Sequence, residues 1–307
     1  MFDVAAAQQR IAPYIHRTPL LQSALLNDLA DAELFFKCEN LQKVGAFKAR
    51  GACNAVLSLS DEDATKGVAT HSSGNHGAAL AWAAAIRDIP ATIVVPRNAK
   101  QIKKDAISSY GGRIVECEPT LSARESTLAE IVTESGANFI PPYDDDRIIS
   151  GQGTVALEIV DQVQNLDVAI TPVGGGGLLA GCLLGFKDTG TAVFGAEPEG
   201  ADDAYRSLKQ GTRIASHSPT TFCDGLLTTL GEKNFDIIRD RVTDVLLVSD
   251  EAVVEAMALI WTRLKLVVEP SAAIVLAAIF RHKAQFRGRR IALVLSGGNV
   301  DLKGLPF

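Results

Sequence analysis

The sequence predicts an α/β protein with two open, twisted parallel sheets that carry helices on both faces. Short β-branched runs alternate with Ala-rich helical segments along the chain, and such alternation is typical of parallel sheets. The chain has 307 residues, of which 47% are hydrophobic and 21% are charged. This length and composition can bury a large core in one or two domains.

The predicted elements fall into two arrays. Residues 76–87 are apolar and Ala-rich up to the break at Pro90, and residues 99–110 form an amphipathic helix that two glycines end. A second array starts near Gly151, so we expect a small domain at residues 68–144, inserted into a large domain made of residues 1–67 and 145–307. The predicted strands are residues 91–95, 113–117, 168–173, 192–196 and 291–295.

Charge and hydropathy exclude several classes of protein. The formal net charge is −6, acids and bases are interspersed, and no long basic run could neutralise nucleic-acid phosphates. No stretch reaches the roughly 18 apolar residues of a membrane span, and residues 1–10 lack the features of a leader. We therefore expect a cytoplasmic protein with a small-molecule substrate. The five cysteines lie far apart without a C-x-x-C pair, which predicts reduced, buried thiols.

Four consecutive glycines follow the predicted strand 168–173 and precede a helical segment. Without Cβ atoms the backbone N–H groups can converge on an anion, and the helix adds the positive end of its dipole. The pattern is neither G-x-x-x-x-G-K-[ST] nor G-x-G-x-x-G with an acidic residue about 20 positions later. We expect it to bind a phosphate that is not part of a nucleotide; the alternative is a flexible turn. This glycine loop consists of Gly174, Gly175, Gly176 and Gly177.

A single lysine, Lys48, follows Phe47 at the start of an apolar helical stretch that runs towards Leu57. Burial would disfavour the ammonium form and lower the lysine pKa, which is the condition for an amine to form a Schiff base with an aldehyde. The alternative is a solvated surface charge, as most lysines are.

Two further segments place polar groups where ligands bind. Residues 71–77, H-S-S-G-N-H-G, precede a predicted helix, so their donors can face one carboxylate at the helix N-terminus. The predicted strand 291–295 ends in S-G-G-N, which puts Ser296 at the carboxyl edge of a parallel sheet. The alternatives are a helix cap for the first segment and an ordinary turn for the second.

Together, A-F-K-A-R-G at residues 46–51, S-S-G-N-H-G at 72–77, the glycine loop and S-G-G-N at 296–299 resemble the fold-type II pyridoxal-phosphate enzymes. The resemblance is to the branch of serine/threonine dehydratases and serine racemases, and these ordered motifs carry it across nearly the whole chain. It implies the tryptophan synthase β-like fold and pyridoxal 5'-phosphate as cofactor. It also implies loss of water and then ammonia from a β-hydroxy amino acid to leave a 2-oxo acid. The rival activity is serine racemisation with elimination as a side reaction.

The resemblance assigns residues to the cofactor. Lys48 would bind its aldehyde and, once released, remove the Cα proton of the substrate. Phe47 would pack beside the ring, Asn75 would hydrogen-bond the 3'-oxygen, and the glycine loop would hold the 5'-phosphate. Ser296 would face the pyridine nitrogen, where a neutral hydroxyl does not keep the ring protonated and so weakens it as an electron sink.

The resemblance also assigns residues to the substrate. Ser72, Ser73 and Gly74 would take the α-carboxylate, with His76 in the same segment, and Thr228 would add a hydroxyl donor. Ser73 matches the second base of the racemases, which permits racemisation without requiring it.

Arg124, in S-A-R-E at residues 122–125, stands where serine racemases and hydroxyaspartate-dehydrating relatives have an arginine that can reach a second carboxylate. A guanidinium binds a carboxylate in bidentate fashion, so Arg124 would favour 3-hydroxyaspartate over serine or threonine. The alternative is a surface arginine paired with Glu125 or another neighbour.

Residues 196–203, A-E-P-E-G-A-D-D, offer oxygen ligands suited to Mg²⁺ or Ca²⁺, although a solvated acidic loop is the alternative. The resemblance implies that Glu197, the carbonyl of Ala201 and Asp203 bind a divalent cation, Mg²⁺ or else Ca²⁺ or Mn²⁺, away from the chemistry. A homodimer is a further expectation from the resemblance.

Overall fold

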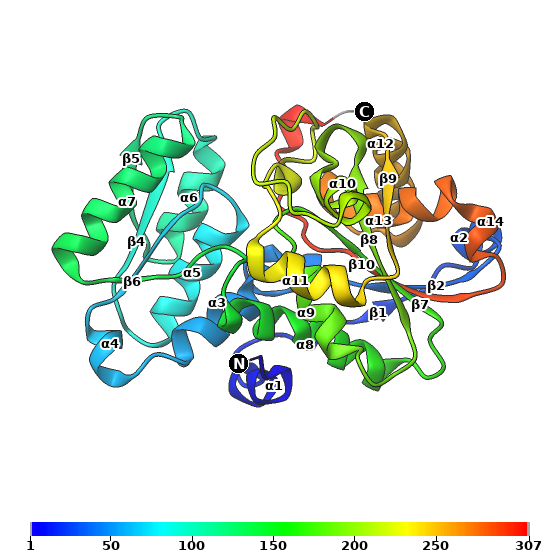
Figure 1. Ribbon diagram of the computed structural model, residues 1–307, viewed down its shortest axis with the longest axis horizontal. Helices are drawn as coiled ribbons and strands as arrows, with labels where there is room; N and C mark the ends of the chain where they lie inside the picture. Colours follow the sequence, from blue (N-terminus) through cyan, green and yellow to red (C-terminus); the bar gives the residue numbers. More distant parts are fainter. Residues whose placement is uncertain (1, 306–307) are drawn as a thin grey trace.

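The computed structural model describes residues 2–305, apart from the side chain of Lys303, and its strands form two sheets. The six-stranded sheet has the order β1-β2-β10-β7-β8-β9; its β1–β2 pair is antiparallel and its other pairs are parallel. The four-stranded sheet has the order β5-β4-β3-β6 and is parallel. Figure 1 shows the four-stranded sheet on the left and the six-stranded sheet on the right.

The elements have the following bounds. The strands of the six-stranded sheet are β1 (Leu20–Leu21), β2 (Glu33–Lys37), β7 (Val168–Pro172), β8 (Ala192–Pro198), β9 (Asp244–Val248) and β10 (Arg290–Val294). Those of the four-stranded sheet are β3 (Val68–His71), β4 (Ala91–Pro96), β5 (Arg113–Cys117) and β6 (Asn138–Phe139). The helices are α1 (Val4–Ile11), α2 (Ala24–Ala30), α3 (Lys48–Leu57), α4 (Asp61–Thr65), α5 (Asn75–Ile86), α6 (Gln101–Ser109), α7 (Leu121–Ser135), α8 (Asp146–Gln162), α9 (Gly177–Gly185), α10 (Asp203–Gln210), α11 (Glu232–Arg241), α12 (Asp250–Leu259), α13 (Pro270–Arg281) and α14 (Lys283–Phe286).

The predicted fold class is confirmed, because both faces of the six-stranded sheet are covered by helices. Ala169 and Ile170 are neighbours on β7, and successive side chains of a strand point to opposite faces. Ile170 packs in a core with α12 and α13, whereas Ala169 packs in a core with α8, α9 and α11. The predicted strands are present as β4, β5, β7, β8 and β10, and the predicted helices are α5 and α6.

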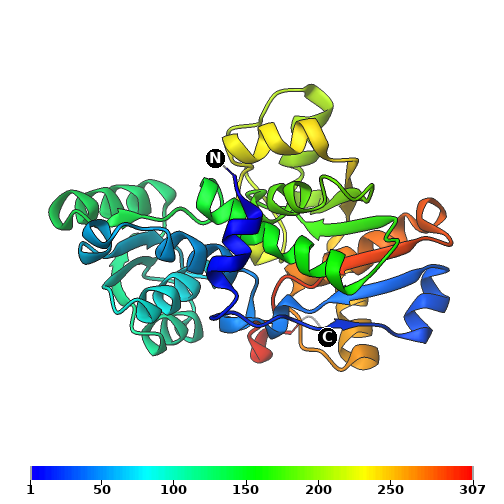
Figure 2. The ribbon, with the colours of Figure 1, turned by 90° about the horizontal axis from the view of Figure 1, so that it is seen from below.

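The core beside the four-stranded sheet draws on segments outside it. Ala52 and Val56 of α3 pack with Leu80 of α5 and Ile93 of β4. In Figure 2, α1 crosses the junction between the two sheets, and it contacts both α3 and α8. The proposed domain boundaries, at 67/68 and 144/145, stay a prediction.

A buried cluster of charges anchors α3, the helix that begins with Lys48. The Arg50 guanidinium donates to Glu39 and Glu158 at 2.7 Å each, and Lys37 Nζ donates to Glu158 at 2.6 Å. The side chains of Lys37, Glu39 and Arg50 are fully buried. Opposite charges balance in this cluster, and removing one partner would leave an uncompensated buried charge. The cluster therefore fixes the start of α3 against β2 and α8.

Two further expectations concern the cysteines and membranes. All five cysteines are free and buried, as predicted. Among the helices of residues 2–305, none has the length and apolar character needed to cross a membrane.

Candidate active site

A cavity of about 630 Å³ lies between the two sheets, lined by segments that follow β3, β7 and β10. Ligands of open α/β sheets bind at these carboxyl ends of the strands. Every residue assigned above to cofactor or substrate lines this cavity: Phe47, Lys48, Ser72, Ser73, Gly74, Asn75, His76, Arg124, Gly174, Gly175, Gly176, Gly177, Thr228 and Ser296.

Lys48 is the first residue of α3, and its amine lies in this cavity. Its Nζ donates a hydrogen bond to the carbonyl of Pro142 at 2.7 Å and lies 5.1 Å from the centre of the Phe47 ring. Burial lowers the pKa of Lys48 to about 8, against the opposing effect of the Glu269 carboxylate. An amine with this pKa is partly deprotonated near neutral pH and can attack an aldehyde. Phe47 N donates to the Ser296 carbonyl at 3.0 Å, which joins the two motifs.

The glycine loop joins β7 to α9 and leaves no room for side chains. Gly176 has a φ of +88°, in the left-handed region that favours glycine. A Cβ atom on Gly175 would lie 2.3 Å from the ring of Tyr143. The loop and the first residues of α9 line the cavity that holds Lys48, so their backbone N–H groups are available to a phosphate there. The site therefore fits a cofactor with both an aldehyde and a phosphate.

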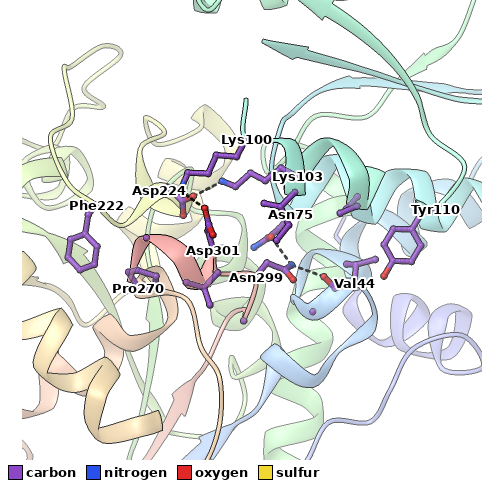
Figure 3. Close-up of a pocket in the computed structure, with 18 residues that line it drawn as sticks. Val44, Asn75, Lys100, Lys103, Tyr110, Phe222, Asp224, Pro270, Asn299 and Asp301 are labelled. Carbon is purple, nitrogen blue, oxygen red and sulfur yellow. Dashed lines mark hydrogen bonds and ion pairs between the residues drawn. The ribbon is translucent and has the colours of Figure 1, made fainter. Parts of the chain in front are cut away.

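Asn75, the first residue of α5, lies in a chain of hydrogen bonds. Its Nδ2 donates to Glu269 at 3.0 Å, and its Oδ1 accepts from Asn299 Nδ2 at 2.9 Å. Asn299 in turn donates to the Val44 carbonyl at 2.7 Å, as Figure 3 shows. Burial raises the pKa of Glu269 to about 7, and the hydrogen bond from Asn75 opposes the shift. These contacts fix the orientation of the Asn75 amide.

The N-terminus of α5 is open to a ligand. Gly74 precedes the helix, and no side chain caps it. The hydroxyl of Ser72 accepts from Gly74 N at 3.3 Å rather than from a helical N–H group. His76 is buried with Nε2 3.0 Å from the Ile140 carbonyl, and burial lowers its pKa to about 3, so the ring is neutral. The helix-cap alternative is therefore wrong for Ser72, and the uncapped start of α5, which lines the cavity, can take a carboxylate.

Arg124 lies on α7 and reaches the same cavity. Within residues 2–305 its guanidinium has no hydrogen bond or ion pair, so the alternative pairing with Glu125 is not observed. Burial and the positive charge of Arg124 lower the pKa of nearby His71, so this ring adds no charge beside Arg124 at neutral pH. A free guanidinium in a cavity is suited to bidentate binding of a carboxylate.

Several residues of the cavity were not predicted from the sequence, namely Lys103, Tyr143, Asp224 and Glu269. Glu269 precedes Pro270 at the start of α13, a pattern that indicates a helix start but not an active site. Lys103 Nζ donates to Asp224 at 2.5 Å. Lys103, Asp224 and Asn75 also line a second cavity of about 550 Å³, shown in Figure 3, so they separate the two cavities.

The predicted cation ligands lie where β8 runs into α10. Glu197 is fully buried, and its carboxylate accepts from Ala204 N at 3.0 Å and Tyr205 N at 2.9 Å. Asp203 is 1% exposed; its Oδ2 accepts from Leu230 N at 2.8 Å, but its Oδ1 has no hydrogen-bond partner. Burial raises the pKa of both carboxyls. The alternative of a solvated acidic loop is therefore wrong for these two side chains.

Whether a cation fits beside Glu197 and Asp203 depends on the Asp203 oxygen that has no hydrogen-bond partner. Across the described residues, no three His, Cys, Asp or Glu side chains gather into a metal-binding group. The predicted set, however, has only two carboxylates and the carbonyl of Ala201. Two buried carboxylates with one oxygen left unbonded fit a cation, because a buried charge is stable only when it is paired or bound to metal.

Comparisons with known proteins show the family of this chain. The family model of pyridoxal-phosphate dependent enzymes matches residues 11–297. The chain is 50% identical to the beta-hydroxyaspartate dehydratase of Paracoccus denitrificans (strain Pd 1222), over 99% of this chain and 98% of that one. It is 47% identical to the serine racemase of Dictyostelium discoideum, over 99% and 95% of the two chains. The structure of maize serine racemase has a TM-score of 0.96 at 45% identity, covering 98% of this chain and 94% of that one.

The fold, the lysine and the glycine loop define a pyridoxal-phosphate-dependent enzyme with the tryptophan synthase β-like architecture. The chain belongs to the serine racemase and dehydratase family of fold-type II enzymes. The family and the cofactor predicted from the sequence are thereby confirmed. Dehydratases and racemases occur among its relatives at similar identity, so the family alone is compatible with either reaction.

Proposed function

We propose that this enzyme is a dehydratase that converts 3-hydroxyaspartate to a 2-oxo acid and ammonia, with serine and threonine as weaker substrates. The observation that carries the proposal is the unpaired guanidinium of Arg124 in the cavity that also holds Lys48 and the open N-terminus of α5. The identity of 50% to a beta-hydroxyaspartate dehydratase supports the same substrate.

The two carboxylates of such a substrate would be held separately. The α-carboxylate would accept hydrogen bonds from Ser72, Ser73 and Gly74 at the N-terminus of α5, where the helix dipole favours negative charge. Arg124 would bind the β-carboxylate through two parallel N–H donors. Serine and threonine lack this second carboxylate and would leave the guanidinium unpaired.

The cofactor and Lys48 have separate roles in the reaction of the bound substrate. Pyridoxal phosphate, when bound, draws electron density from the substrate Cα and so acidifies its proton. Lys48, with its lowered pKa, accepts this proton. The electron pair forms a Cα–Cβ double bond as the Cβ–O bond breaks, and the hydroxyl takes up one proton and leaves as water, so that the proton lost from Cα balances the proton gained by the leaving group. Water then hydrolyses the released enamine to a 2-oxo acid and ammonia.

A serine racemase with side elimination is the second candidate. Ser73 lines the same cavity as Lys48 and would act as the second base on the opposite face of the substrate. The identity of 47% to a serine racemase supports this candidate. Formation of D-serine from L-serine, measured by chiral chromatography, distinguishes it from a pure dehydratase.

We also propose two features of the holoenzyme. A divalent cation, Mg²⁺ or else Ca²⁺ or Mn²⁺, would be held by Glu197, the Ala201 carbonyl and Asp203. It would neutralise buried carboxylates and fix the start of α10, without taking part in proton transfer. The second feature is a homodimer, which light scattering of the purified enzyme would detect.

The test compares substrates in the wild type and in Arg124→Ala. Release of ammonia and 2-oxo acid would be measured from L-serine, L-threonine and the 3-hydroxyaspartate isomers. We expect 3-hydroxyaspartate to be preferred and Arg124→Ala to lower its kcat/KM by at least about 100-fold, with little effect on serine. Arg97→Ala, which removes a surface arginine paired with Glu118, is the control. Equal effects on all substrates would exclude the assignment of Arg124 to the second carboxylate.

A further inference from the structure

His71 lines the active-site cavity and ends strand β3, directly before the S-S-G-N-H-G motif. Pairing with β4 fixes its backbone, because His71 lies opposite Val94 and Ser72 N donates to the Val94 carbonyl at 3.1 Å. The ring stacks on Phe139 of β6, with the ring centres 6.2 Å apart and the planes at 21°. His71 therefore presents its ring to the cavity from the rigid end of a strand, which suits precise contact with a ligand.

The fold brings His71 and Arg124 to the same side of the four-stranded sheet. Alternate side chains of a strand share a face, so His71 lies on the face of Ala69. Ala69 and Leu128 of α7 belong to one core cluster. Arg124 stands one helical turn before Leu128 and so lies on the same side of α7. Burial and then the charge of Arg124 lower the pKa of His71, as expected for two neighbouring side chains.

One nitrogen of the His71 ring is left for a ligand. Nδ1 is enclosed by the protein and has no hydrogen-bond partner among the described residues. Nε2 also lacks a partner within residues 2–305, but it is not enclosed, so it can meet a ligand in the cavity. A carboxylate only accepts hydrogen bonds, and it would therefore select the neutral tautomer that carries its proton on Nε2.

We propose that His71 is a specificity-determining residue that donates a hydrogen bond from Nε2 to the β-carboxylate held by Arg124. The inference rests on the dicarboxylate substrate of the proposed function and adds a second donor to the same subsite. A neutral donor beside the guanidinium adds a hydrogen bond without bringing a second positive charge close to the first. Serine and threonine have no β-carboxylate, so this hydrogen bond should favour 3-hydroxyaspartate alone.

Equilibrium binding of L-aspartate and L-alanine to the holoenzyme measures the contribution of this subsite. The two ligands differ only by the β-carboxylate, and neither has a β-hydroxyl to lose. Their Kd values would be obtained by titration, from the change that each ligand causes in the visible absorbance of the bound cofactor. We expect the wild type to prefer L-aspartate by at least about 100-fold, because the second carboxylate meets both Arg124 and His71.

Three variants of His71 separate the hydrogen bond from a structural role. His71→Phe keeps a ring to stack on Phe139 but has no donor, and it should lower the preference for L-aspartate about tenfold. His71→Gln, whose amide can reach the place of Nε2, should keep the preference within about threefold of the wild type. His71→Asn, whose amide reaches only the place of Nδ1, should behave like His71→Phe. Circular dichroism would confirm that the variants fold.

His282→Phe is the matched control, because His282 is also partly buried but lies at the end of α13, with Nε2 3.4 Å from the Leu247 carbonyl. It should leave the preference for L-aspartate unchanged.

The possible outcomes separate this inference from the proposed function. An unchanged preference in His71→Phe, together with its loss in Arg124→Ala, would overturn the role of His71 and leave the dicarboxylate substrate standing. Equal weakening of both ligands in His71→Phe would also overturn that role, because a purely structural effect does not depend on the β-carboxylate. A wild type that binds the two ligands equally would contradict the substrate of the proposed function, and this inference with it.

Discussion

Lys48 and Glu269 face the same cavity, and burial shifts the pKa of each towards neutral pH. The pKa of the Lys48 amine falls to about 8, and the pKa of the Glu269 carboxyl rises to about 7. Burial disfavours the charged form of both groups; the Glu269 carboxylate only partly restores it for Lys48, and the hydrogen bond from Asn75 only partly restores it for Glu269. A proton can therefore move on or off either group near neutral pH at a small cost in free energy. Glu269 also accepts the hydrogen bond that orients Asn75.

The raised pKa of Glu269 should make the cofactor-free protein less stable as the pH rises. The folded state holds the proton more tightly than the unfolded state, so stability is lost as pH rises from the ordinary carboxyl pKa of 4.5 to about 7. Glu269→Gln removes this dependence. Between about pH 5 and about pH 8, the free energy of unfolding of the wild type, measured by urea unfolding, should fall by on the order of 3 kcal/mol more than that of the variant. Glu130→Gln, which changes an exposed carboxylate of α7, is the control; parallel pH profiles for the wild type and Glu269→Gln would refute the assignment.

The residues of the site that were predicted from the sequence all lie within short motifs. Lys48, Asn75 and Ser296 each stand in a short motif, and the resemblance of these motifs to the fold-type II enzymes gave the three residues their predicted roles. Glu269 and Tyr143 have no such pattern, because their roles come from contacts across the chain. Glu269 accepts a hydrogen bond from a residue 194 positions away. Motifs that resemble a known family thus predict the reactive groups, whereas the groups that orient and shield them depend on tertiary structure.

The connection from β7 to α9 shows how one element can depend on a single backbone angle. Gly176 turns the chain through a φ of +88° directly before the helix begins. A Cβ atom there would lie 2.5 Å from Leu230 Cδ1 and 3.0 Å from Asn234 Cβ. Asn234 Nδ2 donates to the Gly175 carbonyl at 2.6 Å, so a shift of Asn234 would also move the phosphate loop.

Gly176→Ala should therefore weaken cofactor binding beyond the cost of the backbone angle. Gly190→Ala is the matched control, since Gly190 has a φ of +73° but a Cβ atom would meet only open space. We expect Gly190→Ala to cost about 1 kcal/mol of stability without changing cofactor affinity. Gly176→Ala should raise the Kd for pyridoxal phosphate at least about tenfold. The Kd would be measured by titration, from the visible absorbance of the bound cofactor. Equal cofactor affinity in the two variants would contradict the steric argument.

At the scale of the whole molecule, the strands predicted from the sequence are β4, β5, β7, β8 and β10, whereas β3 (V-A-T-H) and β9 (D-V-L-L-V) were missed although each contains two β-branched residues. β4 reads A-T-I-V-V-P and β7 reads V-A-I-T-P, and both are largely buried. β1 and β6 have two residues each and exist only through pairing. β2 was not predicted, because the charged residue Lys37 interrupts its apolar pattern. In the structure Lys37 is buried and forms an ion pair with Glu158 of α8. Strand order was not predicted, because β2 pairs with β10 from the other end of the chain.

One ion pair bridges the two sheets across the active-site cavity. Lys103 lies on α6, beside the four-stranded sheet, and Asp224 adjoins residues that pack in the core of the six-stranded sheet. Their side chains are 31% and 48% exposed, so the pair should contribute only about 0.2–1 kcal/mol. Because the pair joins the two walls of the cavity, this energy should favour the closed, substrate-binding arrangement more than it favours folding.

Lys103→Ala should therefore raise KM by up to about fivefold while the unfolding midpoint stays nearly unchanged. Salt screens a partly exposed pair, so about 1 M salt should raise KM in the wild type and have little further effect in the variant. Lys66→Ala is the control, because Lys66 forms a similarly exposed pair with Asp63 that does not cross the cavity. Steady-state kinetics at low and high salt would measure the effect. A lowered unfolding midpoint with unchanged KM would show instead that the Lys103–Asp224 pair stabilises the fold and does not couple the two sheets during binding.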